Sequence, residues 1–500
     1  MPADNLTTPP GTTSSDATPV VDTGPDPRRW LALAVIAVAQ LMIVLDVSVV
    51  NIALPDAGID LGISAANIQW VVTAYTLAFG GLLLLGGRIA DFIGRKRAFL
   101  IGLAGFAGAS ALGGIAPNQE LLFAARGLQG AFAALLAPAA LSLLAVTFTD
   151  AKERARAFAV FGAISGGGAA IGLILGGVLT EYASWRWTLG INVPIAALTM
   201  VLAVVLVKES RATGDRRYDV PGVLLSTLGL VSLVYGFSKA AEEGVGWSDP
   251  VTLGLLAVAA VLLVSFVLYE RRASHPLLPL RVVLDRIRGG SYLVFLLVGA
   301  GIFAIFLFLT FYFQQTLGYS PLESGFAFLP FSGGIIVGAG IVSQLLPRVG
   351  PRPLIIAGLA LGVLGMLWLT QIESTSAYVT EVLPAEIAIS FGMAAVFVPA
   401  SSTALVGVAE HDAGIASAVL NTSQQVGGSL GLALLSTFYA SAVTGHLADN
   451  PGEAPGEAFV HGYHVAFLWG AVFLAVALVI AAVLISAKKD DLPADAAMAV

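Results

Sequence analysis

The sequence predicts an all-α integral membrane protein with 14 transmembrane helices, arranged as two six-helix halves plus a two-helix insert. Hydrophobic residues make up 57% of the 500-residue chain and charged residues only 11%, whereas a soluble domain carries about 25% charged residues. Long apolar runs recur along the chain, and Lys and Arg fall almost wholly in alternate connections. The mean hydropathy of +0.88 agrees with a chain built to face a lipid bilayer.

Apolar runs of about 18 residues or more are candidates for transmembrane helices. The sequence contains 14 such runs, at residues 30–54, 68–87, 98–116, 120–146, 157–180, 188–207, 220–239, 251–270, 290–313, 322–346, 354–371, 383–406, 414–441 and 463–487.

The basic residues test this count, because Lys and Arg accumulate in cytoplasmic loops. With the N-terminus inside, all but three of the 25 Lys and Arg residues fall in cytoplasmic loops or tails; the three are Arg126, Arg186 and Lys239. A wrong helix count would scramble this alternation. We therefore predict a multi-pass protein of the cell membrane with both termini in the cytoplasm.

An internal repeat divides the chain. "GRKRAFLIGL" (94–103) recurs as "GPRPLIIAGL" (350–359), and each copy lies between two apolar runs. Repeated halves are typical of transporters.

The Pro- and Thr-rich start of the chain is too polar to fold and lacks the features of a signal peptide. The predicted parts are a disordered cytoplasmic tail (1–28), an N-terminal half (29–208), a two-helix insert with flanking cytoplasmic loops (209–289), a C-terminal half (290–487) and a cytoplasmic tail (488–500).

Several classes of function are excluded. The chain has no Cys, and it contains no G-x-G-x-x-G, G-x-x-x-x-G-K or H-E-x-x-H motif. No basic patch is interleaved with aromatic residues, as nucleic-acid binding requires. We expect no enzyme activity, no cofactor, no metal and no nucleic-acid partner. With no nucleotide-binding domain, transport must run on an ion gradient or downhill.

The loop "GGRIADFIGRKR" (86–97) has features beyond those of a cytoplasmic loop. The enrichment of Lys and Arg in cytoplasmic loops explains its basic residues, but it does not explain the spacing of its glycines and its acidic residue. Glycine lets helix ends approach closely, and a carboxylate suits the N-terminus of a neighbouring helix. We expect Asp91 to contact the start of the thirteenth apolar run, around residues 414–417. The predicted conformational latch between the halves comprises Gly87, Arg88, Asp91, Gly94 and Arg95.

This loop matches the major facilitator superfamily motif G-x-x-x-D-x-x-G-R-[KR]-[KR], and the resemblance extends over roughly residues 30–487. The chain is similar to the fourteen-helix drug:proton antiporters at "LDVSVVNIALP" (45–55), "RGLQGAFAALLAP" (126–138), "SWRWTLGINVP" (184–194) and "GIASAVLNTSQQVGGSLGLAL" (414–434). The resemblance implies a major facilitator fold and a multidrug or natural-product efflux transporter. Its expected partners are protons and a small lipophilic substrate, and we expect a monomer.

One segment departs from the family pattern. In "GAISGGGAAIGLILGG" (162–177), Leu173 occupies the position where the family usually has Pro, so the kink that Pro introduces is lost. Gly168, Gly172 and Gly176 still leave one helix face bare for helix packing. Leu173 keeps open an alternative, an uptake carrier or facilitator without proton exchange. A non-transporting membrane sensor or scaffold is the alternative from another class, but no inter-helix segment is long enough for a soluble domain.

Asp46 lies within the first apolar run, nine residues before Pro55, where we expect the helix to end. A charge at membrane depth costs about 2.5–3.5 kcal/mol even on the milder scales, and such charges usually have partners. Arg126, at a similar depth in span 4, is the expected partner. Two interpretations compete: a static buried pair that fixes helix packing, and a proton-coupling site formed by Asp46 and Arg126. The family resemblance favours the second.

The second half offers no comparable acid, because Glu323, Glu381 and Glu386 fall in or near predicted outer loops. We therefore expect a neutral or singly charged lipophilic cargo. Aromatic faces suit such a cargo, and span 9 supplies several aromatic residues. The predicted substrate cavity comprises Asn51, Tyr75, Gln129, Phe306, Gln314, Asn421 and Gln425.

Overall fold

A computed structural model describes residues 28–211, 219–240, 242, 245–273, 276, 278–408, 412–452 and 454–491. Within these residues, 14 helical segments are long and apolar enough to cross a membrane, as predicted. Most boundaries agree with the predicted runs within a few residues. The predicted tail 1–28, except Arg28, and residues 492–500 of the tail 488–500 lie outside the described residues.

The helices of the first half and the insert are α1 (Arg29–Leu61), α2 (Trp70–Ile93), α3 (Arg95–Gly114), α4 (Gln119–Thr147), α5 (Ala151–Tyr182), α6 (Trp187–Gly190), α7 (Asn192–Leu206), α8 (Val220–Ala240) and α9 (Pro250–Glu270). The rest are α10 (Leu280–Val283), α11 (Arg286–Phe311), η1 (Tyr312–Thr316), α12 (Pro321–Ala327), α13 (Leu329–Val349), α14 (Pro351–Leu369), η2 (Tyr378–Val382), α15 (Leu383–Thr403), α16 (Ala413–Asp449), α17 (Pro455–Leu484) and η4 (Lys489–Asp491).

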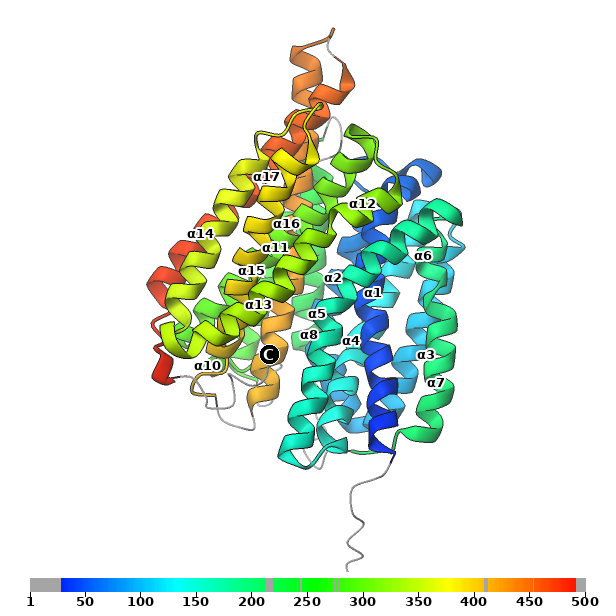
Figure 1. Cartoon of the computed structure of the whole chain (residues 1–500), viewed down its shortest axis with the longest axis vertical. Coiled ribbons are helices and arrows are strands. Elements are labelled where there is room, and N and C mark those ends of the chain that lie inside the picture. The colour runs from blue at the N-terminus through cyan, green and yellow to red at the C-terminus, as the bar shows by residue number, and fades with distance from the viewer. Residues whose placement is uncertain are drawn as a thin grey trace, which may run out of the picture.

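The long helices run side by side in two bundles (Figure 1). α1–α7 form the bundle on the right, α11–α17 form the other, and α8 packs between them against α2 and α16. We call the end at which α1 begins and α17 ends the terminal end, and the other the opposite end. The hairpin between α16 and α17 projects beyond the bundle at the opposite end (Figure 1), because α16 continues to Asp449 rather than ending near residue 441.

α1 corrects one prediction, because the helix does not end at Pro55. It continues through this buried proline to Leu61, where Gly62 closes it with a left-handed φ of 61°. Proline removes one backbone donor and crowds the carbonyl four residues earlier, yet tertiary packing holds the helix together around it. Asp46 therefore lies in the middle of a 33-residue helix, 15 residues before its last residue, Leu61, rather than nine residues before a helix end at Pro55.

Glycines set the distance between α2 and α4. An ideal Cβ on Gly130 would lie 2.2 Å from the Tyr75 carbonyl oxygen, and one on Gly86 would lie 2.0 Å from the Ala134 carbonyl oxygen. Only glycine fits at such crossings, since no side-chain carbon can lie this close to a backbone atom. The close crossing places the face of α4 that carries Arg126 and Gln129 directly against α2.

The internal repeat corresponds to equivalent helix junctions. Gly94 joins α2 to α3 with φ 109°, and Gly350 joins α13 to α14 with φ 84°. Both angles lie in the region that favours glycine. A glycine at the start of each repeat is therefore required by the backbone turn itself.

Candidate functional site

A buried ion pair lies in the centre of the first half. Arg126 Nη1 on α4 donates to Asp46 Oδ2 on α1 over 2.6 Å, and neither side chain is more than 1% exposed. The structure thus brings together the two charges that the sequence paired. A pair removed from water to this degree is stable only where the remaining donors and acceptors also have partners.

Arg126 has such partners on two helices. Its Nε donates to the Val71 carbonyl over 2.8 Å, and its Nη1 also donates to Gln129 Oε1 over 2.7 Å. The guanidinium carbon lies 4.5 Å from the centre of the Tyr75 ring, a favourable position for a cation. Arg126 is therefore held in place even without Asp46.

The second oxygen of Asp46 is also bound. Its Oδ1 accepts from Gln129 Nε2 over 2.6 Å and from Asn192 Nδ2 over 2.8 Å. Both amides also lie within 3.1 Å of Ser110 Oγ, which donates to the Leu189 carbonyl over 2.8 Å. Three donors thus converge on the carboxylate, which accepts hydrogen bonds through both oxygens when ionised. We call Asp46, Arg126, Gln129, Asn192 and Ser110 the Asp46 network.

Two members of this network, Ser110 and Asn192, are not among the residues predicted from the sequence. Ser110 and Asn192 are polar side chains within apolar helices, 0% and 1% exposed. Their polarity inside apolar runs was the available signal. Nothing in the sequence showed that their helices, α3 and α7, would turn these two side chains toward Asp46.

The bare face of α5 packs against the turn of α1 that carries Asp46. Ideal Cβ atoms on Gly168, Gly172 and Gly176 would meet α1 atoms at 3.1, 2.6 and 2.8 Å. The nearest neighbour of Gly172 is Ser48 Cβ. The three glycines therefore lie where the sequence predicted close packing. α5 is continuous through Leu173, with no proline inside it.

A first prediction concerns this packing. Gly172→Ala would place its Cβ 2.6 Å from Ser48 Cβ, and overpacking of this kind costs about 1–3 kcal/mol. We expect purified Gly172→Ala protein to melt several degrees below the wild type. Gly162→Ala on the same helix is the matched control, because nothing lies within 4 Å of that position. Equal melting temperatures for the two variants would contradict close α1–α5 packing.

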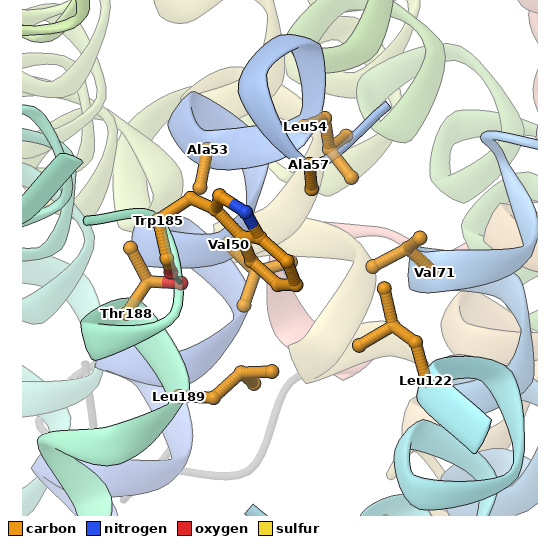
Figure 2. Close-up of a pocket in the computed structure, with 9 residues that line it drawn as sticks. All are labelled: Val50, Ala53, Leu54, Ala57, Val71, Leu122, Trp185, Thr188 and Leu189. Carbon is orange, nitrogen blue, oxygen red and sulfur yellow. Dashed lines mark hydrogen bonds between the residues drawn. The ribbon is translucent and has the colours of Figure 1, made fainter. Parts of the chain in front are cut away.

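Apolar side chains fill the space between the Asp46 network and the opposite end of the bundle. The space there is only about 10 Å³ and is lined by Val50, Ala53, Leu54, Ala57, Val71, Leu122, Trp185, Thr188 and Leu189. In Figure 2 the Trp185 indole fills the centre of this group. Its Nε1 donates to Asp60 Oδ2 over 3.0 Å, which fixes the ring. A space of this size holds about one water molecule at most, and nearly all of the side chains around it are apolar.

The two halves are hydrogen-bonded at the opposite end. Gln314 Nε2 donates to the Ile52 carbonyl over 2.9 Å, and the Leu322 N–H donates to Glu181 Oε2 over 3.1 Å. α12 lies so close to α5 that an ideal Cβ on Gly325 would be 2.6 Å from the Leu173 carbonyl oxygen. These contacts, together with the apolar side chains around Trp185 described above, close the opposite end.

An open hollow lies toward the terminal end of the second half, between α11, α15 and α16. Its volume is about 340 Å³, and it is lined by Phe295, Ser401, Ala404, Leu405, Ser417, Leu420, Asn421 and Gln424. This mixed lining suits an amphipathic organic molecule, and the volume is at the lower end of small-molecule sites.

The seven predicted cavity residues do not share one cavity. Asn421 alone among them lines the hollow, while Tyr75 and Gln129 belong to the buried centre of the first half. Gln314 lies in the contact between the halves at the opposite end. Each of the others has its own surroundings: Asn51 donates to the Val47 carbonyl, Phe306 packs on Phe328 and Phe331, and Gln425 lies against Gly80.

The predicted latch residues lie at the terminal end. Asp91 accepts from Arg95 Nε over 3.1 Å within the same loop, so in this structure it is paired locally rather than with 414–417. Arg88 is exposed. Glu209, which the sequence did not single out, accepts from the Lys96 and Arg97 backbone N–H groups at the start of α3.

Gly94 and Gly87 differ in what surrounds them. An ideal Cβ on Gly94 would lie 2.7 Å from the Glu209 carboxyl carbon, whereas one on Gly87 would make an ordinary 3.6 Å contact with Pro138. The expectation that Gly87 permits close helix approach is therefore wrong. Gly86 has that role, because an ideal Cβ there would lie 2.0 Å from the Ala134 carbonyl oxygen on α4.

The second half holds a buried acid, contrary to the sequence prediction. Glu386 lies on α15 and is 0% exposed, with Tyr378 Oη 3.1 Å from its Oε2. The sequence placed Glu386 near an outer loop, but the residue is buried, with Tyr378 of η2 against it. Asp46 is therefore not the protein's one fully buried acid.

Comparison with known proteins agrees with this architecture. The Major Facilitator Superfamily profile matches residues 36–432. The chain is 50% identical over 473 residues to the puromycin resistance protein pur8 of Streptomyces alboniger, covering 93% of each chain. It is 40% identical over 466 residues to the cephamycin export protein CmcT of Amycolatopsis lactamdurans, covering 92% of this chain and 94% of that one.

A third relative is the tetracenomycin C resistance and export protein of Streptomyces glaucescens, 34% identical over 430 residues, with 85% of this chain and 79% of that one covered. Among solved structures, a bacterial homologue of the human lysosomal transporter Spinster, inward-facing and unoccupied, aligns with a TM-score of 0.64 at 15% identity. It covers 94% of this chain and 100% of that one. This likeness concerns the fold.

Proposed function

The chain belongs to the Major Facilitator Superfamily, and from that premise we propose that it is a secondary active exporter exchanging protons for a lipophilic natural product. The observation that carries the proposal is the fully buried Asp46–Arg126 pair, closed toward one end by apolar side chains. An exchanger needs a carboxylate that meets one side of the membrane at a time. We therefore propose Asp46 as the proton site and Arg126 as its partner.

The Asp46 network offers a route from protonation to movement. A proton on Asp46 removes the negative charge that holds Arg126 Nη1, while Arg126 keeps its bonds to Val71 and Gln129. The link between α1 and α4 weakens, although Gln129 still donates to Asp46, and α1 moves more readily with the glycine face of α5. Proton uptake and helix movement are coupled in this way.

The cargo is proposed from the hollow and from the relatives. Phe295 and Leu420 offer apolar surface, and Ser417, Asn421 and Gln424 offer hydrogen bonds. The named relatives confer resistance to, or export, puromycin, cephamycin and tetracenomycin C. An amphipathic antibiotic of this size class is the proposed substrate.

The proposal also covers the orientation of the protein in the membrane and its oligomeric state. We place the terminal end in the cytoplasm because most Lys and Arg residues lie there, and we propose a monomer of the cell membrane that carries no enzyme activity. The terminal-end hollow would then receive cargo from the cytoplasm.

Transport by the purified chain tests the proposal. Reconstituted into proteoliposomes with an imposed pH gradient, the protein is expected to accumulate puromycin against its concentration gradient and to move protons in the opposite direction. A pH-sensitive dye inside the vesicles reports the proton flux. Drug movement that only runs down its own concentration gradient, whatever the pH gradient, would favour a facilitator instead.

A second prediction concerns Asp91. We propose that it leaves Arg95 and contacts the start of α16 when the terminal end closes, because the free backbone N–H groups there attract a carboxylate. Asp91→Ala is then expected to slow turnover while leaving puromycin binding nearly unchanged, since the open state does not use this contact. Asp449→Ala at the exposed far end of α16 is the control. Normal turnover by Asp91→Ala would reduce the loop to a topology signal.

A further inference from the structure

Glu386 lies in the second half, near the end of α12. It is on the first turn of α15, and Tyr378 of η2 covers it. Tyr378 Oη lies 2.7 Å from the Ala327 carbonyl oxygen and 3.1 Å from Glu386 Oε2. Ala327 is the last residue of α12, so this tyrosine connects the end of α12 to Glu386.

The number of hydrogens available to Tyr378 and its two partners indicates the protonation state of Glu386. A tyrosine hydroxyl has one hydrogen, a carbonyl oxygen only accepts, and an ionised carboxylate only accepts. Tyr378 gives its hydrogen to the closer oxygen, that of Ala327. The contact with Glu386 is then a hydrogen bond only if Glu386 carries a proton and donates it toward Tyr378 Oη.

The surroundings of Glu386 agree with a neutral acid. Its other oxygen, Oε1, is buried and has no hydrogen-bond partner among the described residues. An ionised carboxylate without a partner in an apolar site carries a penalty of several kcal/mol. The adjacent η2 and α12 contribute Tyr378, Glu381 and Glu323. The titratable groups on α11, α13 and α14 lie near the terminal end: Arg286, Arg288, Tyr292, Arg348 and Arg352.

α12 is the helix that closes the opposite end. Its Leu322 N–H donates to Glu181 on α5, and its Gly325 packs on the Leu173 carbonyl. If Glu386 loses its proton, the carboxylate takes the hydrogen of Tyr378, and the Ala327 carbonyl loses its donor. The end of α12 then loses its hydrogen bond to Tyr378 of η2.

We propose that Glu386 is a second proton-binding site, at which one proton holds α12 against α5 and keeps the opposite end closed. The proton forms a bond to Glu386 Oε2 and is released to water when α12 moves away. This inference goes beyond the proposed exchange at Asp46 and does not need it, because closure at Glu386 requires neither cargo nor a gradient.

A labelling experiment without cargo tests the inference. The chain contains no Cys, so a single reporter thiol is unambiguous. Ser324 on α12 is 0% exposed, and its hydroxyl bonds only within its own helix turn, to the Ser320 carbonyl. Ser324→Cys is therefore a conservative reporter that maleimide reaches when α12 separates. Val379→Cys, at a position 67% exposed, normalises for the intrinsic pH dependence of thiol reactivity.

We expect the normalised labelling of Ser324→Cys to be slow at low pH and to increase about fivefold as pH rises, the effect of one lost hydrogen bond of ordinary strength. Adding Glu386→Gln, whose amide donates permanently to Tyr378, should keep labelling slow at every pH. Adding Tyr378→Phe should make it fast at every pH. Glu381→Gln is the matched control and should keep the wild-type pH dependence.

Two results would overturn the inference. One is an unchanged pH dependence in Glu386→Gln, which would assign the titration to another group. The other is slow labelling in Tyr378→Phe at all pH values, which would show that the tyrosine does not tie α12. Failure of proton-coupled puromycin transport in proteoliposomes would remove the proposed function but leave this labelling result standing.

Discussion

Asp46→Asn is expected to reduce pH-gradient-driven drug accumulation to background. Asparagine has nearly the same shape and keeps one acceptor oxygen for Arg126, but it cannot bind and release a proton in the physiological range. The measurement is puromycin uptake into everted membrane vesicles with an imposed pH gradient. A pH dye should also show that drug binding to the purified variant no longer releases protons.

Folding must be separated from coupling in this variant. Removing one partner of a buried pair costs about 3–5 kcal/mol, although Arg126 keeps Val71, Gln129 and the Tyr75 ring as partners. Asp46→Glu retains an acid and should keep part of the coupling even if yield falls. Asp249→Asn is the matched control, because Asp249 caps α9 and asparagine caps a helix equally well. Coupled uptake by a stable Asp46→Asn protein would leave Asp46 a structural role only.

Arg126→Ala is expected to shift the pH optimum of transport upward. Arg126 Nη1 lies 2.6 Å from Asp46 Oδ2, and a neighbouring positive charge stabilises a carboxylate. Without Arg126, proton release to the cytoplasm requires more alkaline conditions. Transport is measured across a series of pH values at a constant gradient, and the yield of folded protein should also fall.

Arg126→Lys separates charge from geometry. Lysine restores the positive charge and should move the optimum part of the way back. It lacks the planar fork that lets Arg126 reach Val71, Gln129 and Asp46 at once, so full recovery is not expected. Arg352→Ala, which removes an exposed arginine on α14, serves as the control. A stable Arg126→Ala protein with the wild-type pH profile would contradict a coupling role and favour a static clamp.

The sequence by itself determined the class of the protein. Fourteen apolar runs, alternating basic loops and the ordered motifs require a bundle of membrane helices, because backbone groups in lipid must be satisfied within a helix. The pairing of Asp46 with Arg126 was also predictable. Each is a charge deep in an apolar run, and the cost of leaving either alone is large enough to demand a partner.

Only the tertiary structure decided which side chains complete the site. Ser110 and Asn192 join the Asp46 network because of how α3 and α7 rotate about their axes, and hydropathy carries almost no information on rotation in helices that are apolar all round. Gly86 rather than Gly87 makes the close contact with α4 for the same reason. α1 continues through Pro55 because neighbouring helices support it, which no local rule at proline foresees.

Glu386 shows the same limit most clearly. Counted along the chain, it lies near the start of a span and was expected close to water. In the structure, Tyr378 of η2 lies against the acid and connects it to the last residue of α12. Burial is set by what other segments place over a residue. For Glu386 those segments lie up to 59 residues away in the chain (Ala327) and meet it through a single tyrosine hydroxyl.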